Sequence, residues 1–494
     1  MIDSQDRAAP IAHPLSAQRA AHVLALGLLL ICAITLKTSI WELRPQIFND
    51  SPSYLVPAIS LLAGRGYGVQ EDGFRTPTFP LYLATLIAPF DRTHLNACTD
   101  AHRAVCIGRA ADFSDGQVIL AVIVLANILL GCGITILLYA LGWQLTRSYL
   151  VALLFGAGYA LNIATAFWEI SIMTETLTTF LLLAVVLLTL HAQKQNSRTS
   201  LALGIVLAIL ALCHTLFLFF APLPALYLLV RRLGEGWTRA LKFIAPVILI
   251  PLLAIGAWSA FNYFVNGAFT PSTVSGYVLI QTVYPVIQNA PEGYDGITQT
   301  LVGYRNAQIR ETGKPTGAVF RAWRDMMKET DLTFTQVSGK LNALSLYLMW
   351  HYPRTYLQSA AESFARFWDF AFFHYDPVPE GAARVGELFA NDTTQALMNL
   401  LFWLVSFLVG ALLVLARRGA RSPISREALW GAAFLTAIVW YAALISSFTN
   451  LGDNARYRVT VTPLQYAVVV AAFWMLWQLL RARRGAIVSI KPLG

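Results

Sequence analysis

Apolar runs joined by short polar connections extend along most of the chain. The first run covers residues 22–40, after a polar leader. Further runs lie at 117–141, 149–166, 172–190, 200–213, 215–230, 241–264, 396–416, 427–448 and 459–480. Crossing the hydrocarbon core of a bilayer takes ~20 apolar residues per helix, and backbone polar groups there must be bonded within the protein. The pattern predicts an all-α polytopic membrane protein with about ten transmembrane helices.

The charges of the connections predict the orientation. The connections expected in the cytoplasm are basic. The turns expected outside, at 168–175 and around His214, contain no Lys or Arg. Basic loops remain in the cytoplasm, so the N-terminus is predicted there, and the first run is interpreted as an uncleaved signal anchor. Two extracytoplasmic loop regions follow, at 41–116 and 265–395.

These loops suggest three parts of the chain. Residues 1–264 form an N-terminal transmembrane module that includes the loop 41–116. Residues 265–395 form a periplasmic region, in which apolar and aromatic residues at helical spacing predict helices at the membrane interface. Residues 396–494 supply the C-terminal transmembrane helices.

Composition excludes several classes of protein. Of 494 residues, 56% are apolar and 13% are charged, which is too much apolar surface for a soluble domain of this size. The net charge of +9 comes from the basic connections, which explains it without nucleic acid. No CxxC pair or Cys/His cluster indicates zinc. Cys98 and Cys106 share one polar loop, where a disulfide is left open. The short connections suggest a bacterial inner (plasma) membrane.

The first loop contains the main catalytic candidate. Residues 48–68 are predicted to form a short helix that Asp50 or Ser51 caps, with Pro52 in the first turn and Gly64 after the end. Asp50 is therefore either a capping carboxylate or a general base that takes a proton from an acceptor hydroxyl. Further along, Arg75 either meets an anionic group or is a solvated interfacial arginine.

Carboxylates also gather at the predicted outer start of the fourth crossing. Glu175 is a second acidic candidate, with capping by Thr174 as the alternative. Glu169 is interpreted as a carboxylate that the N-terminus of a helix favours. His214 is interpreted as a hydrogen-bonded interfacial histidine.

Arg456 and Arg458 precede the last run, at a point predicted to lie outside, where short loops disfavour positive charge. A guanidinium clamp on a lipid-linked phosphate offsets that bias. The alternative is a surface ion pair between Arg456 and Asp453. Tyr54 and Tyr457 are expected at the membrane interface.

Four stretches together carry a family resemblance. These are "DSPSYLVPAISLLAGRGY" from Asp50, "RTPTFPLYLA" at 75–84, "SIMTETLTTFLLL" at 171–183 and "ARYRVTVTPL" at 455–464. Their order resembles GT-C type glycosyltransferases that use polyprenyl-phosphate sugars, such as protein O-mannosyltransferases and lipid A aminoarabinose transferases. The resemblance implies that Asp50 is the catalytic carboxylate and that Arg456 and Arg458 adjoin the lipid-donor site. Many members carry a second acidic residue where Ser51 stands here.

The resulting hypothesis is a glycosyltransferase that moves a sugar from a polyprenyl-phosphate donor to an acceptor hydroxyl on a glycan, lipid or protein, at the periplasmic face. A single in-line displacement inverts the anomeric centre. The alternative is a transporter or flippase of lipid-linked saccharides. A non-catalytic assembly scaffold is a third hypothesis. No nucleotide-binding or zinc-protease motif occurs. A cofactor is unknown; a divalent cation stays open, although no motif indicates one.

Overall fold

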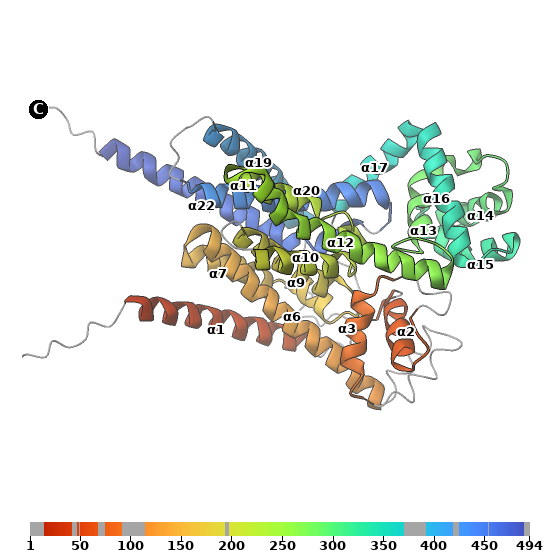
Figure 1. Ribbon diagram of the computed structural model, residues 1–494, viewed down its shortest axis with the longest axis horizontal. Helices are drawn as coiled ribbons and strands as arrows, with labels where there is room; N and C mark the ends of the chain where they lie inside the picture. The colour runs from red at the N-terminus through yellow and green to blue at the C-terminus, as the bar shows by residue number, and fades with distance from the viewer. Residues whose placement is uncertain are drawn as a thin grey trace, which may run out of the picture.

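The structure is a computed structural model of the 494-residue chain. It describes residues 14–41, 47–48, 50–67, 75–90, 114–192, 197–369, 392–417, 424–452 and 454–488. These residues form helices, many of them long and running side by side, and no β-strand (Figure 1). The predicted all-α class is confirmed. Cys98, Cys106 and Asp453 lie outside the described residues.

Eight helical segments among the described residues are long and apolar enough to cross a bilayer. Seven lie within α1 (Pro14–Trp41), α6 (Ser114–Thr146), α9 (Glu175–Ala192), α12 (Trp237–Asn266), α19 (Asp392–Arg417), α20 (Arg426–Thr449) and α22 (Thr462–Val488). The eighth, Thr215–Glu235, combines η2 (Thr215–Phe217), α11 (Pro222–Arg232) and η3 (Leu233–Glu235). The chain is a multi-pass membrane protein.

The expected number of about ten crossings is not confirmed. Two of the apolar runs form shorter helices, α7 (Tyr149–Ala160) with 12 residues and α10 (Ser197–Ala211) with 15. The run at 149–166 is interrupted after α7, and the chain continues as α8 (Ile163–Glu169). Both short helices pack against long ones, α7 on α6 and α10 on α12.

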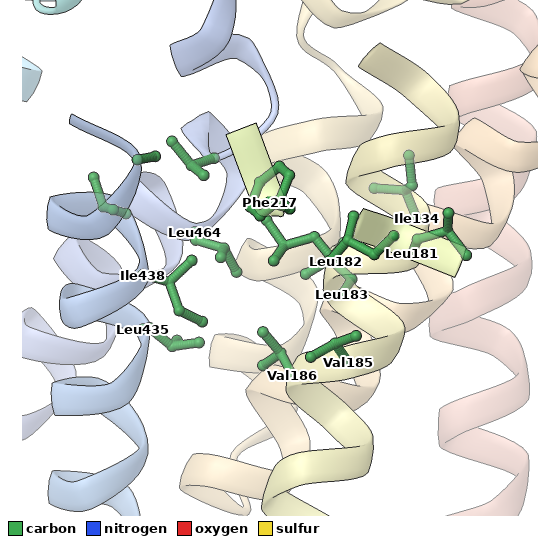
Figure 2. Packing of buried hydrophobic residues seen from close by; sticks show 14 of the residues in the cluster. Ile134, Leu181, Leu182, Leu183, Val185, Val186, Phe217, Leu435, Ile438 and Leu464 are labelled. Carbon is green, nitrogen blue, oxygen red and sulfur yellow. The ribbon is translucent and has the colours of Figure 1, made fainter. Parts of the chain in front are cut away.

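Helix α9 lies at the centre of the membrane-spanning part. Its residues Leu182, Leu183, Val185 and Val186 are fully buried, because neighbouring helices surround it. Figure 2 shows Leu435 and Ile438 of α20 and Leu464 of α22 in the same cluster. A helix that is apolar on every side is typical of such an interior position. Its N-terminal residue, Glu175, is thereby placed at a fixed point of the bundle.

A second hydrophobic core lies beyond one end of the membrane helices, beside α2 and α3 (Figure 1). It is built by α13 (Ser275–Leu279), η4 (Ile280–Asn289), α14 (Asp295–Thr312), α15 (Ala318–Thr330) and α16 (Phe334–His351). We call residues 275–351 the helical cap. Helix α17 (Pro353–Phe367) leads back from it to α20 and α21 (Asn454–Val459). The location of the region 265–395 at the membrane interface stays a prediction.

Candidate active site

Asp50 precedes α2 (Ser51–Leu62), as predicted, but its side chain does not cap the helix. Pro52 lies in the first turn, and Gly64 follows the helix with a φ of 72°. Ser51 does not cap the helix either, because its Oγ accepts a hydrogen bond from the Phe48 N–H (2.9 Å) and donates one to the Ile172 carbonyl (3.0 Å). Asp50 therefore occupies the N-cap position, but the predicted side-chain cap does not form, and its carboxylate is available for other partners.

Those partners are two arginines. Asp50 Oδ1 lies 2.8 Å from Arg75 Nη2, and Asp50 Oδ2 lies 2.8 Å from Arg456 Nη1. Arg75 also donates from Nε to Ser53 Oγ (2.7 Å), and its guanidinium lies over the Tyr54 ring, 4.5 Å from the ring centroid. The chain bends back after α2, so that Arg75, just before α3 (Thr78–Ile87), returns to the start of the loop.

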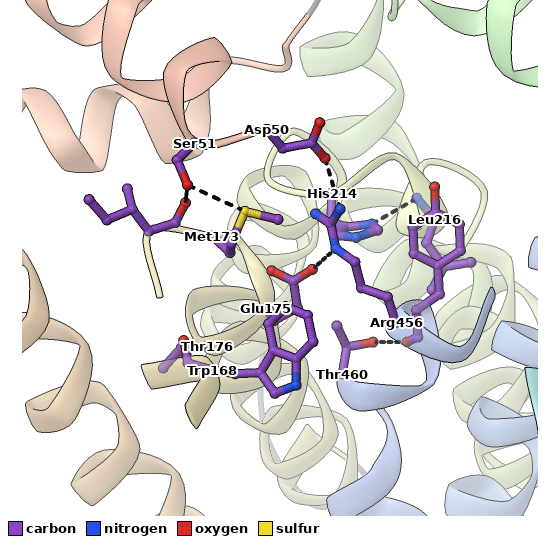
Figure 3. Close-up of polar contacts among 12 residues, drawn as sticks. Asp50, Ser51, Trp168, Met173, Glu175, Thr176, His214, Leu216, Arg456 and Thr460 are labelled. Atoms are coloured by element: carbon purple, nitrogen blue, oxygen red, sulfur yellow. Dashed lines mark hydrogen bonds and ion pairs between the residues drawn. The ribbon is translucent and has the colours of Figure 1, made fainter. Parts of the chain in front are cut away.

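Arg456 joins two carboxylates that are far apart in the sequence. Its Nε donates to Glu175 Oε1, while its Nη1 contacts Asp50 (Figure 3). Glu175 is buried, and the Thr174 hydroxyl forms no hydrogen bond with the described residues, so capping by the Thr174 side chain is not observed. Burial of a carboxylate is tolerated only beside a counter-charge, which Arg456 supplies. The result is an alternating row of Arg75, Asp50, Arg456 and Glu175.

The charges in this row control the protonation of Asp50. Burial acts to raise the pKa of its carboxyl, but the guanidinium charges of Arg75 and Arg456 and their hydrogen bonds outweigh burial. The pKa of Asp50 is therefore held well below its usual range. Because its pKa is low, the carboxyl is ionised near neutral pH. The Asp50 side chain keeps 37% of its surface exposed, so the carboxylate is still accessible.

A cavity of about 580 Å³ opens in front of these charges. Asp50 before α2, Arg75 before α3 and Arg456 of α21 line one side of it, while Gln281 and Phe320 line it from the helical cap. Other lining residues are Tyr54, Trp168, Thr174, His214, Ser272, Thr316, Asn450 and Tyr457. Aromatic rings, hydroxyls and amides around a few charges are typical of a pocket for a polar organic ligand.

Arg458 is not brought into this site. Its Nη1 donates to the Trp368 carbonyl (2.8 Å) and to Asn399 Oδ1 (3.3 Å), behind α21. Burial lowers the pKa of Arg458 to about 10, with Asp369 acting in the opposite direction. Residues two apart on a helix face in nearly opposite directions, so Arg456 and Arg458 diverge.

The two tyrosines flank the charges. Tyr457 lines the cavity, and its hydroxyl accepts a hydrogen bond from Asn450 Nδ2 (3.0 Å). Tyr54 is buried, with its ring against Phe79 and Arg75, so it is a packing residue of the pocket wall.

A buried ion pair joins Lys37 and Glu169, which the sequence pattern does not connect. Lys37 Nζ of α1 lies 2.7 Å from Glu169 Oε1, which also accepts a hydrogen bond from the Tyr159 hydroxyl (2.8 Å). Glu169 is the last residue of α8, so the interpretation as a carboxylate at a helix N-terminus is wrong. Burial raises the pKa of Glu169, against the opposing effect of Lys37. The signal was present as Lys37, the basic residue near the end of the first apolar run.

The acidic residues do not form a metal cage among the described residues. No group of three or more His, Cys, Asp or Glu side chains converges in this part of the chain. Both Asp50 oxygens already contact guanidinium groups, whereas a divalent cation requires several free oxygen ligands. A divalent cation at Asp50 would have to displace these guanidinium contacts, and the chemistry below does not involve one.

Comparisons with known proteins give only distant structural similarity. No protein-family model and no curated protein matches the chain. The archaeal oligosaccharyltransferase AglB from Archaeoglobus fulgidus, solved with an inhibitory peptide and a dolichol-phosphate, has a TM-score of 0.46 at 11% identity over 97% of this chain and 53% of that one. The same organism's oligosaccharyltransferase tethered to an acceptor peptide gives a TM-score of 0.48 at 11% identity, over 96% and 52%. This chain thus spans about half the length of either.

Proposed function

We propose that this protein is an integral membrane glycosyltransferase of the GT-C type. It transfers a sugar from a polyprenyl-phosphate-linked donor to a hydroxyl of a glycan, lipid or protein, on the periplasmic side of a bacterial inner membrane. The observation that carries the proposal is the Asp50 carboxylate between Arg75 and Arg456 at the wall of the cavity. Transfer from a phosphate ester requires a base and positive charge, which a carboxylate and two guanidinium groups beside one cavity supply.

The reaction is a single displacement at the anomeric carbon. The acceptor oxygen forms the new bond to that carbon from one face, while the bond to the phosphate oxygen breaks on the other, which inverts the centre. The electron pair leaves with the polyprenyl phosphate, whose charge Arg75 and Arg456 stabilise. The acceptor proton goes to the Asp50 carboxylate.

The ion pairs of Asp50 with Arg75 and Arg456 give the donor phosphate a second role. An Asp50 that holds both arginines is a weak base, because those contacts keep its pKa low. A phosphate that binds Arg75 and Arg456 competes with Asp50 for the same guanidinium groups. Donor binding therefore loosens the carboxylate and raises its basicity when the acceptor arrives.

The test is the Asp50→Asn variant, purified and reconstituted in proteoliposomes with a panel of polyprenyl-phosphate hexoses and pentoses. Release of polyprenyl phosphate, measured by ³¹P NMR, is expected to fall at least ~100-fold, the usual contribution of a general base. Glu362→Gln is the matched control, because this exposed carboxylate pairs with Arg366 outside the cavity lining. Transfer that persists in Asp50→Asn, with intact size-exclusion behaviour, contradicts the proposal.

A transporter of lipid-linked saccharides is the second candidate. Buried ionisable residues in membrane segments often mark transport pathways, and the Lys37–Glu169 pair is one such feature. Lys37 lies near the end of the span Ala20–Ser39, and neither Lys37 nor Glu169 lines the cavity, which favours a structural role. Flux of a lipid-linked saccharide that Asp50→Asn leaves unchanged, without any transfer, favours the transporter.

A further inference from the structure

His214 is held in one orientation beside the charged row. It precedes η2, and its Nδ1 accepts a hydrogen bond from the Leu216 N–H (3.2 Å). The Tyr457 ring meets it edge-on at 5.3 Å between centroids, and Phe217 packs at 6.2 Å. Its side chain is buried and lines the cavity. Figure 3 shows it next to the guanidinium end of Arg456.

This arrangement fixes the tautomer of the neutral ring. A nitrogen that accepts a hydrogen bond carries no proton, so in neutral His214 the proton is on Nε2. Nε2 forms no hydrogen bond with any residue that the structure describes. Burial, together with the positive charges of Arg456 and Arg75, lowers the pKa of His214 to about 3. The ring is therefore a neutral donor with a free N–H at the cavity.

We propose that His214 is a binding residue whose Nε2–H donates a hydrogen bond to a non-bridging oxygen of the donor phosphate. This inference rests on the proposed function. Arg75 and Arg456 make this part of the cavity attractive to an anion, and a fixed N–H donor adds direction without adding charge. Because the ring stays neutral, it does not compete with the arginines for Asp50 or Glu175.

Two substitutions separate this role from helix capping. In His214→Asn, the amide oxygen replaces Nδ1 as the acceptor for Leu216, while the donor at the Nε2 position is lost. In His214→Gln, the amide nitrogen reaches the Nε2 position, while the acceptor at Nδ1 is lost. A phosphate-binding role predicts that Gln retains ligand affinity and Asn loses it. A purely structural role predicts the reverse order.

The experiment measures binding of a C55 polyprenyl phosphate to full-length protein in nanodiscs, with inorganic phosphate as a second ligand. We expect His214→Asn to weaken binding about 10-fold, the loss of one charge-assisted hydrogen bond, and His214→Gln to stay within about 3-fold of wild type. Competition by inorganic phosphate at equal concentration identifies a free-phosphate site instead of a lipid-linked one and overturns the lipid assignment.

Two further outcomes are decisive. Wild-type protein that binds no polyprenyl phosphate overturns the proposed function and this inference together. Wild-type binding that His214→Asn leaves unchanged overturns only the role of His214.

Nitrogen-15 NMR of the imidazole gives an independent readout, because we expect the Nε2–H tautomer from pH 5 to 8. A ring that titrates within that interval contradicts the assignment.

Discussion

Asp50 is shared between two guanidinium groups, and this sharing determines how the site responds to pH. Its carboxyl pKa is held below the ordinary value of ~4, so the ionised fraction falls only in more acidic solution. Wild-type activity is therefore expected to show no acid limb from Asp50 above pH ~4. By the same sign, the ion pairs stabilise the fold above that pH and lose this contribution as the pH falls through the folded pKa.

Arg75→Gln removes one of the two positive charges, so the pKa of Asp50 is expected to rise. The acid limb of the pH–rate profile should then move to higher pH, alongside a lower rate. Profiles of transfer between pH 4 and 8 measure this shift. Arg321→Gln is a suitable control, since that arginine pairs with Glu311 on the surface of the helical cap. A profile that Arg75→Gln only scales down, without displacement, means that another group limits the rate.

Arg456 has a structural role that can be separated from its chemical one. Arg456→Gln leaves buried Glu175 without its counter-charge, and loss of one partner of a buried pair costs about 3–5 kcal/mol. Adding Glu175→Gln removes the stranded charge, so the double variant is expected to recover most of the thermal stability and none of the transfer activity. Thermal unfolding in detergent and the transfer assay measure the two effects. A double variant no more stable than Arg456→Gln means that Glu175 is not the cause.

The sequence predicts which residues belong to the site better than it predicts which contacts those residues make. Asp50, Glu175, Arg75 and Arg456 were selected from the sequence, and the structure brings them together, although their catalytic roles stay predictions. The predicted side-chain cap at Asp50 does not form, because arginines distant in the sequence compete with the helix N-terminus for the carboxylate. The sequence groups Arg458 with Arg456, because the polar segment before the last apolar run does not reveal the short α21, which turns the two side chains apart.

At the scale of elements, the helical cap supplies one wall of the cavity through α13 and η4. Gly276 of α13 lies against the α16 backbone, where an added Cβ would stand 1.9 Å from the Ser338 carbonyl oxygen. Gly276→Ala is expected to push α13 and its cavity residue Val278 away from α16, at a cost of about 1–3 kcal/mol. Thermal unfolding and donor affinity should both decrease.

Gly339, the residue after Ser338 in α16, provides the control. An added Cβ there meets nothing within 4 Å, and alanine favours the helix by ~1 kcal/mol over glycine. Gly339→Ala should therefore leave activity unchanged and raise the unfolding temperature slightly. Equal effects of the two alanines would contradict the close packing of α13 on α16.

The helices themselves were the easiest elements to predict, since an apolar run in a bilayer has only the helix available to it. The lengths of the helices are harder to predict from the sequence. The apolar run at 149–166 reads as one crossing, yet the chain turns at Leu161 and Asn162 and separates α7 from α8. That turn places Glu169 beside Lys37, a contact that depends on the packing of α1 and not on local sequence.

At the scale of the whole molecule, the cavity lies between the membrane helices and the helical cap, and the loops 41–116 and 265–395 were both predicted on one side. No motif in 265–395 indicated that Gln281 and Phe320 would face Asp50. Such contacts arise from the folding of the cap around its own core, which burial patterns in a single sequence do not specify.

The orientation in the membrane is testable with single cysteines. Glu292 is exposed in the helical cap, and Thr238 is exposed at the start of α12, in a connection predicted to be cytoplasmic. In a background with the five native cysteines replaced, a membrane-impermeant maleimide should label Glu292→Cys in intact spheroplasts. Thr238→Cys should react only after permeabilisation. The basic connections favour this orientation because positive loops resist translocation. Labelling in the opposite order would place Asp50 and its arginines at the cytoplasmic face, where nucleotide sugars are available and a lipid-linked donor loses its rationale.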